Sequence, residues 1–248
     1  VKLSQVRLSE IVTNEQLSLL TAAALDIEVP ESFIINTGAA QDRQVLFATK
    51  RYDRRISDRS KLLDRYPCPL RLHQEDFAQA MGIAAKDKYE TGTKNYLKAI
   101  FDTVRNNSAN PIEDQLRLWD ILIFDFLIGN TDNHIKNISL LYTEDLKQIR
   151  LAPAYDIVST AIYKGSSRDM AIGIGGERSI DRITRSHFSE ASADIGLGRR
   201  IAMARFDAMA DRFEATLRSA SQALIEQGFV AAGAISEKIL KDSGYGRL

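Results

Sequence analysis

At 248 residues, with 44% hydrophobic and 27% charged residues, the chain has the composition of a folded globular protein with one large core or two lobes. Its 33 basic and 33 acidic residues give a formal charge of zero at pH 7, which argues against strong, whole-surface binding of nucleic acid. The single cysteine, Cys68, excludes an intrachain disulfide and a zinc site built from thiolates.

The sequence pattern gives no sign of a membrane span or a targeting segment. The longest apolar run, at residues 121–128, is interrupted by Asp125 and is far too short to span a bilayer. No signal-peptide pattern is visible. We therefore expect a cytoplasmic protein with no membrane partner. The best candidate for a local basic patch is the cluster from Lys50 to Lys61, for which we favour a solvated loop.

The first part of the chain mixes strand and helix signals. We expect a strand end at residues 1–3 and two strands, at 32–36 and 45–49, that flank a glycine-containing turn. Apolar residues at helical spacing follow Thr13, which we take as the N-cap of a helix that stops at Pro30. These signals predict a small, β-rich first part.

Helical patterns dominate from His73 onward. Pro111 suits the first turn of a helix, and the following residues 112–128 are apolar almost all round, so we expect a buried central helix. A hairpin is expected between residues 138–142 and 148–151. The other expected helices cover residues 75–81, 95–104, 201–220 and 235–240. A small β-rich part followed by a large helical part predicts a two-lobed α+β fold, in which ligands favour the crevice between the lobes.

The stretch that carries chemistry is residues 129–137, Gly-Asn-Thr-Asp-Asn-His-Ile-Lys-Asn. Such residues also suit an ordinary surface loop. However, Asp132 and Asn137 stand five positions apart, as the catalytic Asp and the metal-holding Asn of protein kinases do. Phosphoryl transfer needs a carboxylate to orient the acceptor hydroxyl, and an amide and a second carboxylate to hold magnesium. Asp156 supplies that second carboxylate, because the expected hairpin would bring it close to Asn137.

A glycine cluster offers a competing phosphate site. Gly173, Gly175 and Gly176 lack the Lys-Ser/Thr pair of a P-loop and a strand–turn–helix context. We interpret them as turn glycines.

The motifs together resemble those of the HipA family of bacterial serine/threonine kinases. Residues 128–137 and 151–156 (Leu-Ala-Pro-Ala-Tyr-Asp) are similar to its catalytic and metal motifs. Residues 51–55 (Arg-Tyr-Asp-Arg-Arg), 73–76 (His-Gln-Glu-Asp) and 88–90 (Lys-Tyr-Glu) resemble three further family motifs, in the family's order. The resemblance runs nearly end to end. It implies a protein-kinase-like fold with a small β-rich N-lobe remnant at residues 1–52 and a large helical C-lobe at residues 53–248.

The resemblance also implies the roles of individual residues. Asp132 would be the catalytic base, and Asn137 and Asp156 would hold Mg²⁺. Lys2 would contact the phosphates of ATP, with Glu15 as its ion-pair partner.

Further nucleotide contacts implied by the resemblance are Lys50, Arg51, Tyr52, His134, Lys136 and Tyr155, the first three along the adenine. The family commonly has an acidic residue at the place of Lys50 and Phe at that of Tyr52. Adenine contacts at a kinase hinge are largely made by backbone, so these departures bear on side-chain contacts more than on ATP binding. The phosphate-covering loop of kinases would precede Lys2. We therefore expect the 248-residue chain alone to transfer phosphate poorly.

The function implied by the resemblance is that of a toxin kinase regulated by autophosphorylation. Its protein substrate would be an aminoacyl-tRNA synthetase, whose phosphorylation arrests growth, and its partner would be a small DNA-binding antitoxin of the HipB type. Two alternatives stay open. The Asp-x-His-x-x-Asn spacing is also similar to the catalytic loop of lipid kinases, which permits a lipid or small-molecule acceptor. A non-catalytic, antitoxin-binding pseudokinase is the second. A hydrolase ranks below both, because no activated Ser or Cys nucleophile is apparent.

Overall fold

The structure is a computed structural model that describes residues 2–3, 8–38, 45–58, 60–92 and 95–248. Its helices are α1 (Ile11–Ala24), α2 (Phe77–Ala80), α3 (Tyr96–Asn107), α4 (Pro111–Ile128), α5 (Arg185–Asp194), α6 (Arg199–Glu226) and α7 (Ala231–Asp242), with 3₁₀ turns η2 (Ala85–Asp87) and η3 (Tyr245–Arg247). Its strands are β1 (Lys2–Leu3), β2 (Ser32–Asn36), β3 (Val45–Thr49), β4 (Arg54–Arg55), β5 (Leu62–Leu63), β6 (Tyr66–Pro67), β7 (Leu70–Arg71), β8 (Gln74–Asp76), β9 (Ser139–Tyr142), β10 (Ile149–Leu151), β11 (Asp169–Ile174) and β12 (Glu177–Ser179).

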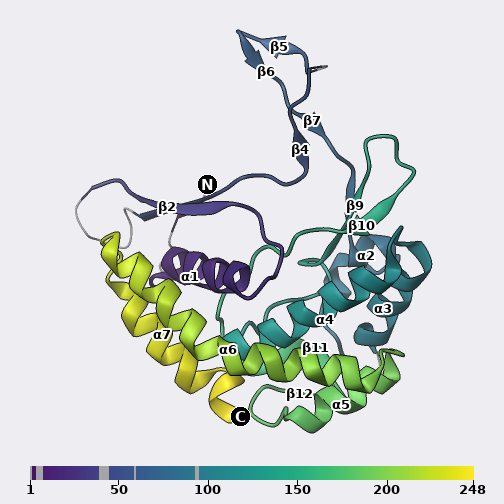
Figure 1. The fold of residues 1–248 in the computed structure, drawn as a ribbon, viewed down its shortest axis with the longest axis vertical. Coiled ribbons are helices and arrows are strands. Elements are labelled where there is room, and N and C mark those ends of the chain that lie inside the picture. Colours follow the sequence, from purple (N-terminus) through teal and green to yellow (C-terminus); the bar gives the residue numbers. More distant parts are fainter. Residues whose placement is uncertain (1, 4–7, 39–44, 59, 93–94) are drawn as a thin grey trace.

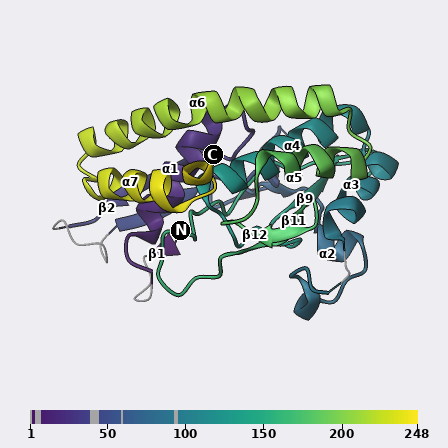
Figure 2. The ribbon, with the colours of Figure 1, turned by 90° about the horizontal axis from the view of Figure 1, so that it is seen from below.

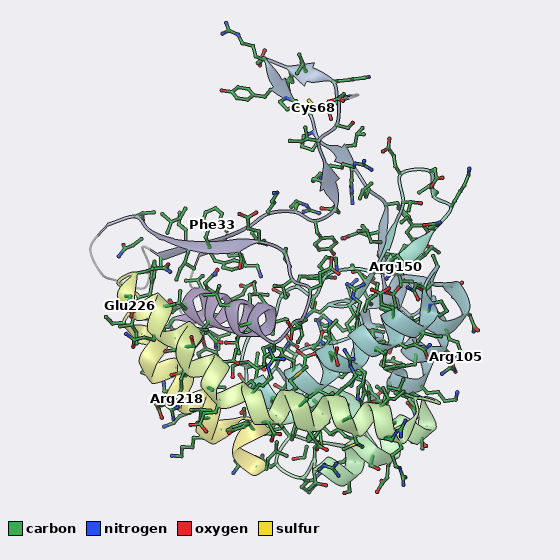
Figure 3. All side chains as sticks on the ribbon, in the orientation of Figure 1. Phe33, Cys68, Arg105, Arg150, Arg218 and Glu226 are labelled. Carbon is green, nitrogen blue, oxygen red and sulfur yellow. The ribbon has the colours of Figure 1, made fainter. Side chains whose placement is uncertain are left out.

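The first sheet has the order β1-β3-β2, with antiparallel pairs, and the predicted strands at 32–36 and 45–49 are confirmed. Phe47 of the central strand is buried, whereas Phe33 of β2 is 49% exposed and belongs to the opposite face (Figure 3). Lys2 is the register partner of Phe47, so it shares the buried face of this sheet. The register alone therefore brings a lysine to the side on which α1 packs.

Helix α1 lies between this sheet and helices α6 and α7 (Figure 1). The predicted limits of this helix, Thr13 and Pro30, are both wrong. The helix begins at Ile11, after Glu10 in a left-handed conformation, and it ends at Ala24, shortly before Asp26 turns left-handed as well. Because α1 is covered on two sides, its polar residues are buried together with its leucines, and buried polar groups require hydrogen-bond partners.

The helical part is built around α4, which begins at Pro111 as predicted. Its second half is buried almost without interruption, and α3 and α6 pack against it. The ring of Trp119 of α4 packs edge-on against that of Phe188 of α5, with 5.6 Å between the ring centroids. The ring centroids of Phe188 and of Phe206 of α6 lie 4.7 Å apart. Figure 2 shows α6 running the length of the molecule beside α4 and α5. The helices predicted at 201–220 and 235–240 are confirmed, and both extend further in each direction.

The predicted hairpin at 138–142 and 148–151 is confirmed as the β9–β10 pair. A third strand, β8, pairs with β9 to give the sheet order β10-β9-β8. We predicted a helix at residues 75–81, but the first two of these residues belong to strand β8. Only Phe77–Ala80 are helical, and Asp76 caps that short helix by accepting a hydrogen bond from the Gln79 N–H.

Three elements between the hairpin and α6 were not predicted: β11, β12 and α5. The interpretation of Gly175 and Gly176 as turn glycines is confirmed, because both have positive φ between β11 and β12. The same interpretation of Gly173 is wrong, because Gly173 lies within strand β11. A Cβ on Gly175 would lie 2.4 Å from the carbonyl oxygen of His187, so this turn packs directly on the start of α5.

Residues 54–58 and 60–71 belong to an arm that stands off the body, with the β4–β7 pair at its base and the β5–β6 pair at its tip (Figure 1). The side chains of Leu62, Leu63 and Tyr66 are 72%, 66% and 76% exposed. The basic cluster that we predicted to be a solvated loop runs into this exposed arm; its residue Arg59 lies outside the described residues.

The predicted two-lobed kinase-like α+β fold is confirmed, with a small sheet and one helix set against a larger helical mass (Figure 1). Across the described ranges, no helix has both the length and the apolar composition needed to cross a membrane.

Candidate functional site

A cavity of about 330 Å³ lies between the small sheet and the helical part. Its apolar wall includes Leu19, Pro30 and Phe47. Seven residues that we predicted to bind the nucleotide line the same cavity: Lys2, Glu15, Lys50, Arg51, Tyr52, Tyr155 and Asp156. The arrangement suits a ligand with one flat apolar end and one charged end.

Lys2 connects two carboxylates at the charged end of the cavity. Its Nζ atom lies 2.8 Å from Glu15 Oε1 and also forms a hydrogen-bonded ion pair with Asp156. Burial opposes the charge of Lys2, but Glu15 and Asp156 outweigh it and raise the pKa of the ammonium group above its ordinary value. Burial raises the pKa of Glu15, and Lys2 acts against that shift. The predicted Lys2–Glu15 pair is therefore present, and Asp156 completes it.

The segment from Lys50 to Asp53 leaves β3 and forms the rim of the cavity. The Arg51 guanidinium donates twice to buried Asp53, at 2.7 Å each, and holds the pKa of that carboxyl below its usual range. The rings of Tyr52 and Tyr155 lie 5.7 Å apart. The Arg51 side chain thus fixes the segment, whereas the two tyrosines offer ring surface to a ligand.

The loop that follows α4 is held by a fully buried carboxyl, Asp125. The Asn130 side chain donates to it at 2.9 Å, and the Asn133 side chain donates to its other oxygen. Burial raises the pKa of Asp125 to about 7, against the effect of the two amide donors. Gly129, with φ of 80°, makes the left-handed turn out of the helix. The loop therefore leaves a rigid helix end at a fixed angle.

Asp132 is exposed on this loop and lines a second cavity, of about 430 Å³. The Tyr89 hydroxyl donates to Asp132 Oδ1 at 2.7 Å, and burial together with Asp132 raises the pKa of Tyr89 to about 12. Asn137 Nδ2 donates to the Asp132 carbonyl at 3.2 Å. Thr160 and Arg178 also border the cavity. An acceptor hydroxyl in this space would meet the Asp132 carboxylate, as general base catalysis requires.

His134 is buried at the centre of the same loop, where the residue as a whole is 6% exposed. Lys88 Nζ lies 2.7 Å from His134 Nε2. Burial and then the Lys88 charge lower the pKa of His134 below 6.5, so the imidazole is neutral and accepts a hydrogen bond from the lysine. We predicted an orienting or nucleotide-proximal role for His134. Its side chain does not line the nucleotide cavity and contacts Lys88.

Asp156 is brought to the loop by its neighbours. The Tyr155 hydroxyl donates to the Lys136 carbonyl at 3.1 Å, and Tyr155 and Asn137 line one small cavity. Asp156 itself has φ of 57°, a left-handed conformation that turns its carboxylate toward Lys2. The hairpin thus returns the chain beside the loop, as the sequence predicted.

Asn137 and Asp156 have the chemistry of a magnesium site, because Mg²⁺ takes oxygen ligands and few of them from protein. The Asn137 amide nitrogen is used by Asp132, which leaves its carbonyl oxygen for a cation. Asp156 already binds the Lys2 ammonium, so its position favours positive charge. In the described part of the chain, no group of three or more His, Cys, Asp or Glu side chains could hold a metal ion.

Lys136 is another predicted nucleotide residue that does not line the nucleotide cavity. Its Nζ atom lies 2.6 Å from Asp76 Oδ2, at the start of α2. Sequence reasoning named Lys88 and Tyr89 as part of a motif but gave them no role, and it treated Asp125 only as an interruption of an apolar run. An acidic residue inside a buried helix was the available signal, because a buried carboxyl needs partners.

The chain matches the family described as HipA-like C-terminal domain over residues 1–217. It is 32% identical to Y4mE of Sinorhizobium fredii over 198 residues, which are 80% of this chain and 44% of that protein. It is 27% identical to the serine/threonine-protein kinase toxin HipA of Shewanella oneidensis over 213 residues, 82% of this chain and 46% of the toxin. The chain spans about half the length of these curated relatives.

Two solved structures share the fold. The Shewanella oneidensis HipA structure, a complex with HipB and operator DNA, matches with a TM-score of 0.75 and 23% identity, over 94% of this chain and 55% of that one. The Helicobacter pylori proinflammatory kinase CtkA matches with a TM-score of 0.55 and 14% identity, over 98% and 83%. The family match covers most of the sequence, and the chain therefore belongs to the HipA-like C-terminal domain family.

Proposed function

We propose that this protein is an ATP- and Mg²⁺-dependent serine/threonine protein kinase of the HipA toxin type. The observation that carries the proposal is the Lys2 ammonium shared by Glu15 and Asp156 at the end of a nucleotide-sized cavity. Relatives named as kinases support it. The boundary between the two lobes, at residue 52, stays a prediction.

The residues divide between two sides of the reaction. On the nucleotide side, Lys2 contacts the phosphates, Tyr52 and Tyr155 border the adenine, and Asn137 with Asp156 hold magnesium. Bound there, the metal would neutralise phosphate charge. On the acceptor side, the Asp132 carboxylate orients the hydroxyl and accepts its proton as the new oxygen–phosphorus bond forms. ADP leaves with the electron pair of the broken bond.

The family resemblance supplies the proposed substrate and partner. The acceptor would be a serine or threonine of a protein, with an aminoacyl-tRNA synthetase as the implied target and growth arrest as the result. Autophosphorylation would regulate the kinase. The Shewanella oneidensis HipA structure contains HipB and operator DNA, which supports a small DNA-binding antitoxin as the partner here. Contact with DNA would then be made mainly by the antitoxin, in keeping with the formal charge of zero.

The test is transfer of labelled phosphate from Mg·ATP, by the full-length protein, to proteins of a bacterial lysate and to purified aminoacyl-tRNA synthetases. Asp132→Asn should reduce transfer by about 10³-fold, within the range for loss of a general base, and should leave nucleotide binding intact. The matched control is Asp145→Asn, a carboxylate on the β9–β10 turn that takes no part in the site.

The alternatives appear as outcomes of the same experiment. Label in a lipid or metabolite fraction, with unlabelled protein, would favour a kinase with a small acceptor. Nucleotide binding without any transfer, combined with growth arrest that survives Asp132→Asn, would favour an antitoxin-binding pseudokinase.

A further inference from the structure

Lys88 differs from the other lysines of the site in what it contacts. Lys2 is shared by two carboxylates, and Lys136 is paired with Asp76. Lys88, by contrast, contacts the His134 imidazole and lies over the Tyr89 ring, 4.8 Å from its centroid. Neither contact carries a negative charge. Within the ranges that the structure describes, Lys88 is therefore a cation beside the catalytic loop that pairs with no carboxylate.

The backbone that carries Lys88 is fixed rather than free. Glu90 is buried and accepts hydrogen bonds from the Tyr96 N–H, at 2.9 Å, and from the Gly173 N–H. Its own N–H donates to the Ala171 carbonyl at 3.1 Å. These bonds tie the segment to the start of α3 and to β11. The anchoring presents Lys88 and Tyr89 side by side over the catalytic loop, and each contacts a different residue of that loop.

His134 holds the Lys88 ammonium beside the loop that carries Asp132 and Asn137. The His134 N–H donates to the Asp132 carbonyl at 2.8 Å, and the Asn137 N–H donates to the His134 carbonyl at 2.8 Å. The residue that binds the ammonium is therefore hydrogen-bonded through its backbone to the acceptor-side Asp132 and to Asn137, which we assign to the nucleotide side.

We propose that Lys88 binds the phosphoryl group during transfer, and that His134 is the positioning residue that holds its ammonium in place. This inference rests on the proposed kinase function. In the transfer, the bond from the γ-phosphorus to the bridging oxygen breaks and ADP keeps the electron pair. The acceptor oxygen bonds to the phosphorus and its proton passes to Asp132. Negative charge on the equatorial oxygens persists throughout, and a cation without a carboxylate partner stabilises it best.

The imidazole suits this task for a physical reason, because an ammonium can only donate hydrogen bonds and His134 Nε2, 2.7 Å away, accepts one from it. It fixes the direction of the ammonium by one hydrogen bond but does not cancel its charge, as a carboxylate would. A second observation points to a built arrangement: His134 is buried and its Nδ1 atom has no hydrogen-bond partner in the described part of the chain. A buried polar atom left without a partner lowers stability, and a functional role of the ring would explain why it is there.

The experiment separates binding of the transferring group from binding of the nucleotide. The variant is Lys88→Ala, with Lys88→Arg as the charge-retaining variant and Lys86→Ala, an exposed lysine of η2, as the matched control. Affinities for Mg·ADP and for Mg·ADP with aluminium fluoride, which mimics the transferring phosphoryl group, are measured by fluorescence of a labelled nucleotide. The rate of a single turnover of Mg·ATP is measured beside them.

Lys88→Ala should lower the single-turnover rate by about 10²–10³-fold, as loss of one preorganised charge donor does, and should weaken the fluoride complex in parallel. Its affinity for Mg·ADP should stay within about twofold of the wild type. Lys88→Arg should recover part of the rate, and Lys86→Ala should match the wild type. His134→Ala should lower the rate with little change in Mg·ADP affinity.

Wild-type behaviour of Lys88→Ala in both the rate and the fluoride complex would overturn the inference. An equal loss of Mg·ADP affinity would overturn it as well, because Lys88 would then bind the ground-state nucleotide or support the fold. If the full-length wild-type protein binds no Mg·ADP and turns over no ATP, the kinase function fails, and that result is distinct from either outcome for the variant.

Discussion

The side chain of Asn14 pairs with the backbone of Ser159 in both directions. Its Nδ2 atom donates to the Ser159 carbonyl at 2.9 Å, and the Ser159 N–H donates to its Oδ1 atom at 3.1 Å. Asn14 precedes Glu15 on α1, and Ser159 follows Asp156 by three residues. One buried amide thus holds the helix that carries Glu15 in register with the segment that carries Asp156, across 145 residues of sequence.

Asn14→Ala should lower the free energy of unfolding by about 2–3 kcal/mol, because it leaves buried backbone groups of Ser159 without partners. Urea unfolding followed by circular dichroism measures the change. Nucleotide affinity should fall as well, because Glu15 and Asp156 would no longer be held in a fixed position relative to each other. The control is Thr21→Val, which removes only the hydroxyl bond to the Leu17 carbonyl of the same helix. Equal stability of the two variants would contradict the assigned role of Asn14.

The stability of the protein should depend on pH through Asp125. Burial raises the pKa of Asp125 to about 7 in the folded protein, against an ordinary value of 3.8. The folded state therefore keeps a proton on Asp125 that the unfolded state releases. The contribution of the protonated Asp125 to stability is complete below pH 3.8 and is lost as pH rises through about 7. The slope should reach about 1.4 kcal/mol of unfolding free energy per pH unit.

Asp125→Asn should flatten that part of the stability curve, since an amide does not ionise. Urea unfolding of both proteins between pH 5 and pH 7.5 measures the two slopes. The comparison depends on slopes, so it tolerates a lower overall stability of the variant, whose amide offers only one oxygen to Asn130 and Asn133. Identical slopes would show that Asp125 is ionised in the folded protein.

Local patterns predicted much of this fold, and non-local contacts account for what was missed. The strands at 32–36 and 45–49 and the β9–β10 hairpin follow from alternation and nearby turns. Strand β8, of sequence Gln-Glu-Asp, forms only because β9 pairs with it from 65 residues further along the chain, at Glu75 and Leu140. Such a polar triplet carries no strand signal of its own.

In the candidate site, too, local patterns predicted some features and non-local contacts account for those that were missed. The hairpin after residues 129–137 correctly indicated that the chain would return to the loop, and it does so at Tyr155, next to Asp156 in the sequence. The pairing of Lys136 with Asp76 was not predicted, because Asp76 lies 60 residues away and caps another helix. The bond from Tyr89 to Asp132 also spans a long separation, and no local pattern encodes it. Residue spacing identifies the loop, whereas tertiary packing decides which of its side chains face the ligand.

Glu15→Gln should weaken nucleotide binding about tenfold, the loss of roughly one charge-assisted hydrogen bond. Without the Glu15 charge, the Lys2 ammonium is held by Asp156 alone, and it then competes with magnesium for that carboxylate. Fluorescent nucleotide titration measures the affinity. Glu31→Gln is the control, because Glu31 pairs with Lys50 at 3.5 Å on the exposed rim. A similar loss in both variants would point to a general charge effect at the cavity.

The stability of the protein in acid should depend on Asp114, which holds the β9–β10 hairpin to α4. Asp114 of α4 is fully buried and binds the Arg150 guanidinium, at 2.9 and 3.0 Å, and the Leu151 N–H at 2.9 Å (Arg150 is labelled in Figure 3). Burial acts to raise the pKa of Asp114, but Arg150, Ser108 and the Leu151 N–H outweigh it and lower the pKa below 3.8. The contribution of Asp114 to stability is therefore present above pH 3.8 and is lost as pH falls through the lower folded-state value.

Asp114→Asn should lower the free energy of unfolding by about 3 kcal/mol at pH 7, because it leaves Arg150 without its buried partner, and the deficit should shrink below pH 4. Glu113→Gln is the matched control. Glu113 contacts the same Arg150 at 2.9 Å but is exposed, so its loss should cost less than about 0.5 kcal/mol. Urea unfolding at pH 7 and pH 3.5 measures both variants. A deficit of Asp114→Asn that stays constant across this range would mean that the carboxyl gains nothing from ionisation in the fold, and that its hydrogen-bonding shape alone holds the hairpin to α4.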